Sequence, residues 1–134
     1  MAIIINNKFV LDSIPKQIGF KFPLNGNAVF NTTTDVRDQL NANIINFLRT
    51  EKSERVFNTR FGAGLRQYVF EAITDQNFES LKNYLKSSIN RNFPNLQVLK
   101  IDLFKSNTQD NSIMIELFYN IINFGNNSVK VILQ

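Results

Sequence analysis

Apolar residues in the segment 36–48 have the spacing of a helix. They recur every three or four positions, at Val36, Leu40, Ile44, Phe47 and Leu48. This spacing gives a helix one apolar face, and it predicts a helix that runs to about Arg49. A threonine at 32–34 is expected to cap this helix, with Asp35 and Asp38 in its first turn, where carboxylates favour the positive end of the helix dipole.

Two more helices are predicted in the middle of the chain. A short one is expected to end near Ala72, and Thr74 or Asp75 should cap a longer one. The apolar face of the longer helix is formed by Phe78, Leu81, Leu85 and Ile89. This helix should stop before Pro94, because the residue that precedes a proline is disfavoured in the helical region.

From Gln97 onward, apolar residues alternate with polar ones, which is the period of a strand. Leu99, Ile101 and Leu103 are expected to share one face of a first strand. A second strand carries its main apolar face at Ile113, Ile115, Leu117, Tyr119 and Ile121.

A final strand is predicted after a glycine-containing turn at residues 124–127. Three strands joined by short loops form an antiparallel meander. On the second strand, Met114 and Phe118 lie opposite the main apolar face. A second apolar face needs either a further layer of the same chain or a partner, and the sequence favours neither.

The predicted fold class is α+β, with about three helices packed on a C-terminal three-stranded antiparallel sheet. Residues 32–134 should form a single domain, because no linker composition interrupts them. Residues 1–31 contain two prolines and two glycines, and we expect them to form an extended N-terminal arm.

Composition excludes many kinds of active site. The 134 residues include no cysteine and no histidine, so thiolate metal sites, cysteine nucleophiles and histidine general bases are absent from the sequence. The 15 Lys+Arg against 11 Asp+Glu are scattered, which does not indicate a nucleic-acid-binding surface. Without an apolar run of about 20 residues or a signal-peptide pattern, we expect a soluble protein made in the cytoplasm, with no cofactor, no metal and no membrane contact.

Any catalysis would depend on carboxylates. Glu71 with Asp75, or Glu54 with Asp35 or Asp38, could form a pair if folding brought them to one cleft. Sequence spacing does not establish such a cleft, and exposed carboxylates are mostly solvated. The sequence therefore favours helix capping and surface charge, and no enzyme activity.

Residues 54–62 follow no regular period and are predicted to form an ordered irregular connection. Glu54 and Arg55 can be a surface ion pair, but we favour a role in which they fix the segment by bonding backbone carbonyls and a helix end. Phe57 and Phe61 are predicted to be core anchors, and Gly62 to form a turn.

The order of motifs from Asn31 to Leu65 resembles the gene twenty-five baseplate wedge family of contractile-tailed phages, whose relatives include baseplate subunits of type VI secretion and of extracellular contractile injection systems. The matching motifs are a helix ending in Asn46-Phe47-Leu48-Arg49-Thr50, then Glu54-Arg55, Phe61-Gly62 and Leu65. The sequence departs from the family pattern at Thr59, where a proline is usual, and at Phe93-Pro94-Asn95, where the family has Glu-Pro-Arg. The second change predicts an apolar contact through Phe93 in place of an ionic one.

The resemblance implies a structural subunit, located in a virion baseplate or in the baseplate of a cytoplasmic injection system. It implies contacts with large wedge proteins through Glu54, Arg55, Phe57, Phe61, Gly62, Phe93 and Pro94. It also implies that sheath strands add to the C-terminal sheet, and the edge strand predicted at Ser128, Val129, Lys130, Val131, Ile132 and Leu133 suits such pairing. The subunit would be monomeric alone and multi-copy in a six-fold assembly.

Two other functions stay open. Some relatives carry the word lysozyme in their names, so a peptidoglycan hydrolase of the tail is one alternative. A small regulatory binding protein of similar fold is the other.

Overall fold

The computed structural model describes residues 17–21, 32–70, 74–105 and 112–133. The chain divides into two compact units, Met1–Ala42 and Asn43–Gln134, and each is described by itself. Among these residues, no helix has both the length and the apolar character that crossing a membrane requires.

In the first unit, a short antiparallel pair precedes a helix. Strand β1 (Gly19–Phe20) pairs with β2 (Thr32–Thr33), and helix α2 (Val36–Arg49) begins three residues later. The predicted threonine cap is wrong: Asp35 caps α2, because its Oδ1 accepts a hydrogen bond of 3.0 Å from the backbone N–H of Arg37. Thr32 and Thr33 pair with β1 instead.

The predicted N-terminal arm falls mostly on residues 1–16 and 22–31, which lie outside the described residues. The extent of the arm and the single domain at 32–134 therefore stay predictions.

The second unit contains the rest of α2, a short helix α3 (Arg66–Phe70) and a long helix α4 (Asp75–Asn92). Thr74 caps α4 as predicted, since its side chain accepts a hydrogen bond from the N–H of Asn77. The helix ends before Pro94, with Phe93 as its C-cap. Its predicted apolar face is confirmed by the burial of Leu81, Leu85 and Ile89.

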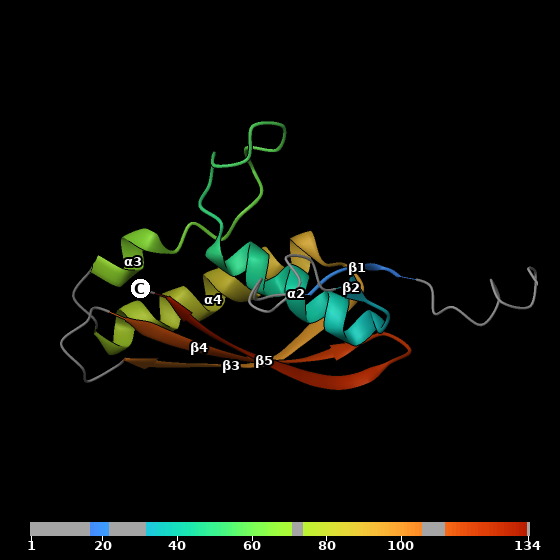
Figure 1. Ribbon diagram of the computed structural model, residues 1–134. Helices are drawn as coiled ribbons and strands as arrows, with labels where there is room; N and C mark the ends of the chain where they lie inside the picture. Colours follow the sequence, from blue (N-terminus) through green and yellow to red (C-terminus); the bar gives the residue numbers. More distant parts are fainter. Residues whose placement is uncertain (1–16, 22–31, 71–73, 106–111, 134) are drawn as a thin grey trace, which may run out of the picture. The chain divides into compact units, whose positions relative to one another are not determined.

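The sheet of this unit consists of β3 (Leu96–Lys105), β4 (Ile113–Ile121) and β5 (Gly125–Leu133), in the order β3-β4-β5, with both pairs antiparallel. Helices α3 and α4 lie on one face of it (Figure 1). The α+β fold class is therefore confirmed.

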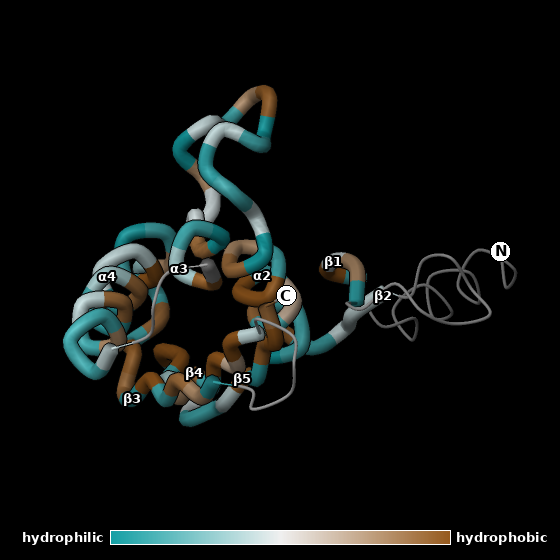
Figure 2. The backbone as a smooth tube through the Cα atoms, turned by 90° about the vertical axis from the view of Figure 1, so that its left-hand side faces the viewer, coloured by the Kyte–Doolittle hydropathy of each residue, from teal (hydrophilic) through white to brown (hydrophobic). Residues whose placement is uncertain are grey.

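The face of the sheet toward the helices is the apolar one, since the buried residues of the three strands are apolar. Figure 2 shows hydrophobic and hydrophilic residues interspersed along these strands. Alternate residues of β4 are buried from Ile113 to Ile121, as the strand period predicts. Tyr119 is fully buried among them, and this burial raises the pKa of its hydroxyl to about 12, although a hydrogen bond with Asn127 acts in the opposite direction.

The predicted position of Leu99 on the apolar face is wrong. Strand β3 has a register shift between Val98 and Lys100, so that Leu99 has no partner on β4. A bulge changes the alternation by one residue, which turns both Val98 and Ile101 toward the helices. Leu99 is 52% exposed as a result.

Candidate partner-binding surfaces

A loop at residues 51–61, called here the projecting loop, extends from the helical layer away from the sheet (Figure 1). Its own backbone closes it: the N–H of Ser53 donates to the carbonyl of Thr59 at 2.8 Å across its neck. A second bond, from Asn58 N–H to Arg55 C=O at 3.3 Å, forms the tight turn at the tip. The loop is thus ordered by bonds within itself.

Two carboxylates fix the base of the projecting loop. Glu54 Oε2 accepts a hydrogen bond of 2.8 Å from the N–H of Glu51. Glu51 Oε1 accepts one of 2.8 Å from the N–H of Arg66, the first residue of α3. A carboxylate at a helix start satisfies an otherwise unpaired N–H and favours the helix dipole. Glu54 therefore orders the segment, as predicted, but it bonds a backbone N–H.

Arg55 lies over an aromatic ring, not against the carbonyl oxygens that the sequence predicted. Its Cζ is 4.0 Å from the centroid of the Phe61 ring. Phe61 in turn meets Phe47 edge to face at 5.4 Å, and Phe47 meets Phe93 at 5.6 Å. Because Phe47 is fully buried, this series of contacts connects the projecting loop to the core and confirms Phe61 as an anchor.

The prediction that Phe57 is a core anchor is wrong. Its side chain is fully exposed, and that of Val56 is 83% exposed. Both residues occupy the turn between Arg55 and Asn58, so their side chains point outward from the tip. Two adjacent apolar side chains held in water by an ordered turn are typical of a contact surface.

Gly62 forms the predicted turn at the foot of the projecting loop. Its φ is +115°, which favours glycine, and a Cβ there would lie 2.6 Å from the carbonyl oxygen of Thr50. The next residue, Ala63, donates its N–H to Phe47 and accepts a hydrogen bond of 2.7 Å from the Tyr84 hydroxyl. The foot of the loop is therefore packed against both α2 and α4.

Phe93 and Pro94 lie just after α4. The ring of Phe93 is half-buried against Phe47, and Pro94 is exposed. Part of the Phe93 ring, which the sequence predicts to contact a partner, therefore packs against Phe47 of the same chain.

Strand β5 forms one edge of the described sheet, since it pairs with β4 alone. Val129 and Val131 are buried, while Ser128, Lys130 and Ile132 point to the opposite face and are exposed. The N–H of Ser128 donates to Oδ1 of Asn127 at 2.9 Å, which places it away from the pairing with β4. Backbone groups alternate in direction along an antiparallel strand, so the N–H groups of Lys130 and Ile132 also face the open edge.

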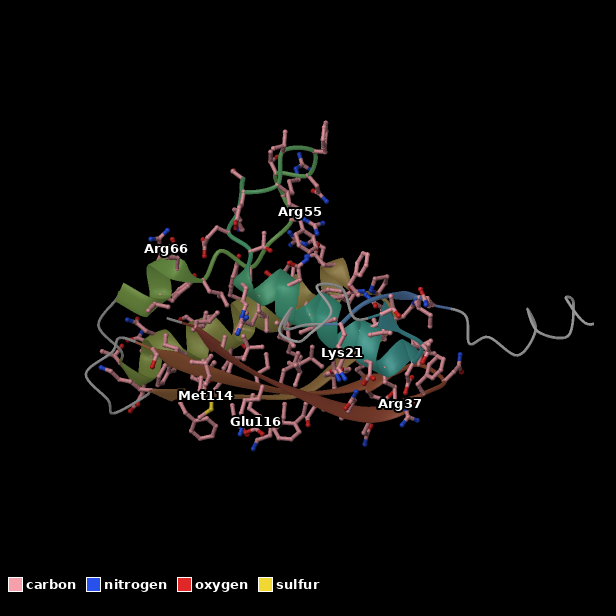
Figure 3. All side chains as sticks on the ribbon, viewed as in Figure 1. Lys21, Arg37, Arg55, Arg66, Met114 and Glu116 are labelled. Carbon is pink, nitrogen blue, oxygen red and sulfur yellow. The ribbon has the colours of Figure 1, made fainter. Side chains whose placement is uncertain are left out.

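The sheet face away from the helices carries an apolar row that the sequence indicated only at Met114. In the register of the strands, Phe104, Met114 and Ile132 lie side by side, and Phe104 and Ile132 are 46% and 52% exposed. Met114 and Glu116 project from this face in Figure 3. The row next to it is charged, and Lys130 Nζ lies 3.7 Å from Glu116 Oε1. The strand alternation could have revealed this row if all three strands had been aligned.

A cleft of about 640 Å³ opens at the end of β5. Ile132 and Leu133 line it on the strand side, and Leu48, Leu65 and Val69 line it on the helical side. Its remaining lining residues, Arg49, Glu51, Glu54 and Arg66, are charged, so the cleft is apolar only in part.

The pairing of Glu71 with Asp75, and of Glu54 with Asp35 or Asp38, stays untested. Glu71 lies outside the described residues, and Glu54 bonds a backbone N–H. Within the described ranges, no group of three His, Cys, Asp or Glu side chains could hold a metal ion.

Comparison with known proteins gives the family. The family model "Baseplate wedge protein gp25" matches residues 34–124. The chain belongs to this family, and it is a structural protein in the baseplate of a contractile tail or injection system. No curated protein matches the sequence.

Two solved structures share the fold. One is a candidate tail lysozyme from Geobacter sulfurreducens, with a TM-score of 0.63 and 19% identity over 75% of this chain and 93% of the other. The other is a chain of the six-fold symmetrised baseplate of the anti-feeding prophage, with a TM-score of 0.63 and 19% identity over 78% of this chain and 85% of that one.

Proposed function

We propose that this protein is a baseplate wedge subunit with two binding surfaces. The projecting loop and the nearby Phe93-Pro94 segment bind the large wedge proteins. The free edge of β5 accepts a strand from the sheath subunit and so starts the first sheath ring.

The wedge contact is supported by the exposed tip of the projecting loop. Phe57 and Val56 are available for a partner, whereas Glu54, Arg55, Phe61 and Gly62 hold the loop in one shape. A preformed loop loses little conformational entropy on binding, so more of the contact energy appears as affinity. In this proposal Phe57 touches the partner, and the other four residues position it.

The observation that carries the sheath contact is the orientation of β5. Its outer N–H groups at Lys130 and Ile132 face an edge that no described strand occupies. Strand addition at such an edge gains affinity from backbone hydrogen bonds and specificity from alternate side chains. The strand also contains Ser128, Val129, Val131 and Leu133. The two valines are buried in the core, and their burial fixes the register of the strand.

The baseplate of the anti-feeding prophage is six-fold symmetrised, which supports a multi-copy place for this chain in a six-fold assembly. We infer a monomer before assembly and no enzyme activity. The candidate tail lysozyme of the same fold keeps a peptidoglycan hydrolase as the alternative.

Electron microscopy of particles that lack only this chain tests the proposal. We expect particles without baseplates and without sheathed tails. Normal sheathed tails would contradict the scaffold function, and the hydrolase would then be tested by lysis assays with Glu54→Gln.

A further inference from the structure

A second cleft, called here the loop cleft, lies between the projecting loop and α4. Its volume is about 540 Å³, and its walls come from residues 52–62 and from residues 84–92. The cationic side chains that line it are Lys52, Arg60 and Arg91. None of the lining residues is Asp or Glu, although the projecting loop contains two glutamates.

The loop cleft has no acidic lining residue because both glutamates of the projecting loop lie elsewhere. Glu51 and Glu54 accept hydrogen bonds from backbone N–H groups and line the cleft beside β5, not the loop cleft. Within the described part of the chain, none of the three cations takes part in an ion pair, and Lys52 instead lies 5.2 Å from the ring of Tyr84. Positive charge is therefore concentrated in this cleft without an acidic partner of its own.

We propose that the loop cleft binds an acidic segment of the wedge protein that covers the tip of the projecting loop. Carboxylates of that segment pair with Arg60, Arg91 and Lys52, and the serine, threonine and asparagine side chains of the walls satisfy its backbone. All three cationic residues are exposed, and guanidinium groups can bind a carboxylate with two hydrogen bonds. The inference rests on the proposed function, because it gives the chemistry of that same wedge contact.

A protein segment fits this cleft better than a nucleic acid does. The loop cleft is adjacent to the apolar tip formed by Val56 and Phe57, so its ligand continues onto apolar side chains. A nucleic acid would instead require cations to continue along its backbone path. The C-terminal end of α4 carries a partial negative charge of about half a unit, which three cations outweigh.

Photo-crosslinking in purified baseplates tests the proposal. p-Benzoylphenylalanine is placed at Ser87, in the wall of the loop cleft, and separately at Phe57, at the tip, and mass spectrometry identifies the crosslinked peptides. We expect the Ser87 position to react with an aspartate- or glutamate-rich peptide of the wedge protein that reacts with position 57. A neutral or basic peptide, a nucleic acid, or no adduct at Ser87 while position 57 reacts would overturn the acidic-segment proposal alone. No adduct at either position would contradict the wedge contact itself.

A matched pair of charge variants gives a second readout. Arg91→Glu reverses a charge in the loop cleft, and Lys86→Glu reverses an exposed charge on α4 that does not line it. We expect Arg91→Glu to reduce incorporation into baseplates at least tenfold and Lys86→Glu less than twofold, with both proteins melting at similar temperatures. A Glu→Arg change in the crosslinked segment should restore incorporation of Arg91→Glu, and equal incorporation of the two variants would overturn the proposal.

Discussion

The ring of Phe61, in the projecting loop, meets the buried ring of Phe47 edge to face, with the ring planes at 80°. This contact lets a loop with little buried surface of its own share the stability of the core. Aromatic pairs of this geometry contribute about 0.5–1.5 kcal/mol beyond the area that they bury.

The first prediction concerns this contact. Phe61→Ala should lower the free energy of unfolding by about 2 kcal/mol, since the ring is only half-buried and large aromatic truncations in full cores cost more. A double-mutant cycle with Phe47→Leu, measured by urea unfolding, should give a coupling energy of about 0.5–1.5 kcal/mol. Additive losses would show that the two rings do not stabilise each other.

Two glycines with positive φ should respond differently to alanine. At Gly62 a Cβ would lie 2.6 Å from a backbone oxygen, whereas at Gly125 it would meet nothing within 4 Å. In both variants an alanine must adopt a positive φ, which costs about 1–2 kcal/mol of backbone strain. Only Gly62→Ala adds a steric overlap to this cost. We expect a loss of about 3 kcal/mol for Gly62→Ala and about 1 kcal/mol for Gly125→Ala in denaturant unfolding. Equal losses would contradict the close approach.

The exposed tip of the projecting loop is predicted to matter for binding and not for folding. Phe57→Ser should leave the free energy of unfolding within about 0.5 kcal/mol of the unchanged protein, because the ring contacts solvent. Its incorporation into baseplates should fall more than tenfold if Phe57 is a central contact, which corresponds to about 1.4 kcal/mol or more. Ile122→Ser, at a residue that is 56% exposed in the β4–β5 turn, is the control and should incorporate normally. A normal level for Phe57→Ser would remove the tip from the wedge contact.

The regular elements of the fold could be predicted from the sequence because their apolar spacing reports which face is buried. The spacing of Leu81, Leu85 and Ile89 was enough for α4, and Pro94 marked its end. The same reasoning failed at Leu99, because a bulge changes the alternation without changing composition. It also failed at Phe57, because hydrophobicity alone does not separate a core residue from one that the fold leaves exposed.

The candidate sites were only partly predictable for a related reason. Glu54 was correctly expected to order its segment, but its bond to a backbone N–H depends on the exact turn that residues 51–54 adopt. The loop cleft joins side chains that are about thirty residues apart, such as Arg60 and Arg91. No local pattern in the sequence brings these two cations together.

Alkaline pH should destabilise the protein through Tyr119. Burial raises the pKa of this hydroxyl from 10.0 to about 12, so between these values the unfolded chain loses the proton and the folded chain keeps it. The stability attached to this group is fully present below pH 10 and falls by about 1.4 kcal/mol per pH unit as the pH rises toward 12. Tyr119→Phe should remove this contribution to the slope in unfolding measured from pH 9 to 12. An unchanged slope would contradict the burial of an un-ionised hydroxyl.

Strand addition at β5 is the central claim, and one backbone N–H tests it most directly. Lys130→Pro removes an N–H that faces the open edge, whereas Lys130→Ala removes the side chain and its contact with Glu116 but keeps the N–H. Both variants should stay folded, because edge strands tolerate proline where the N–H does not pair. The decisive measurement is electron microscopy of particles that carry each variant, scored for sheath on assembled baseplates. We predict sheathed tails with Lys130→Ala and bare baseplates with Lys130→Pro, and equal sheathing of the two would contradict strand addition at this edge.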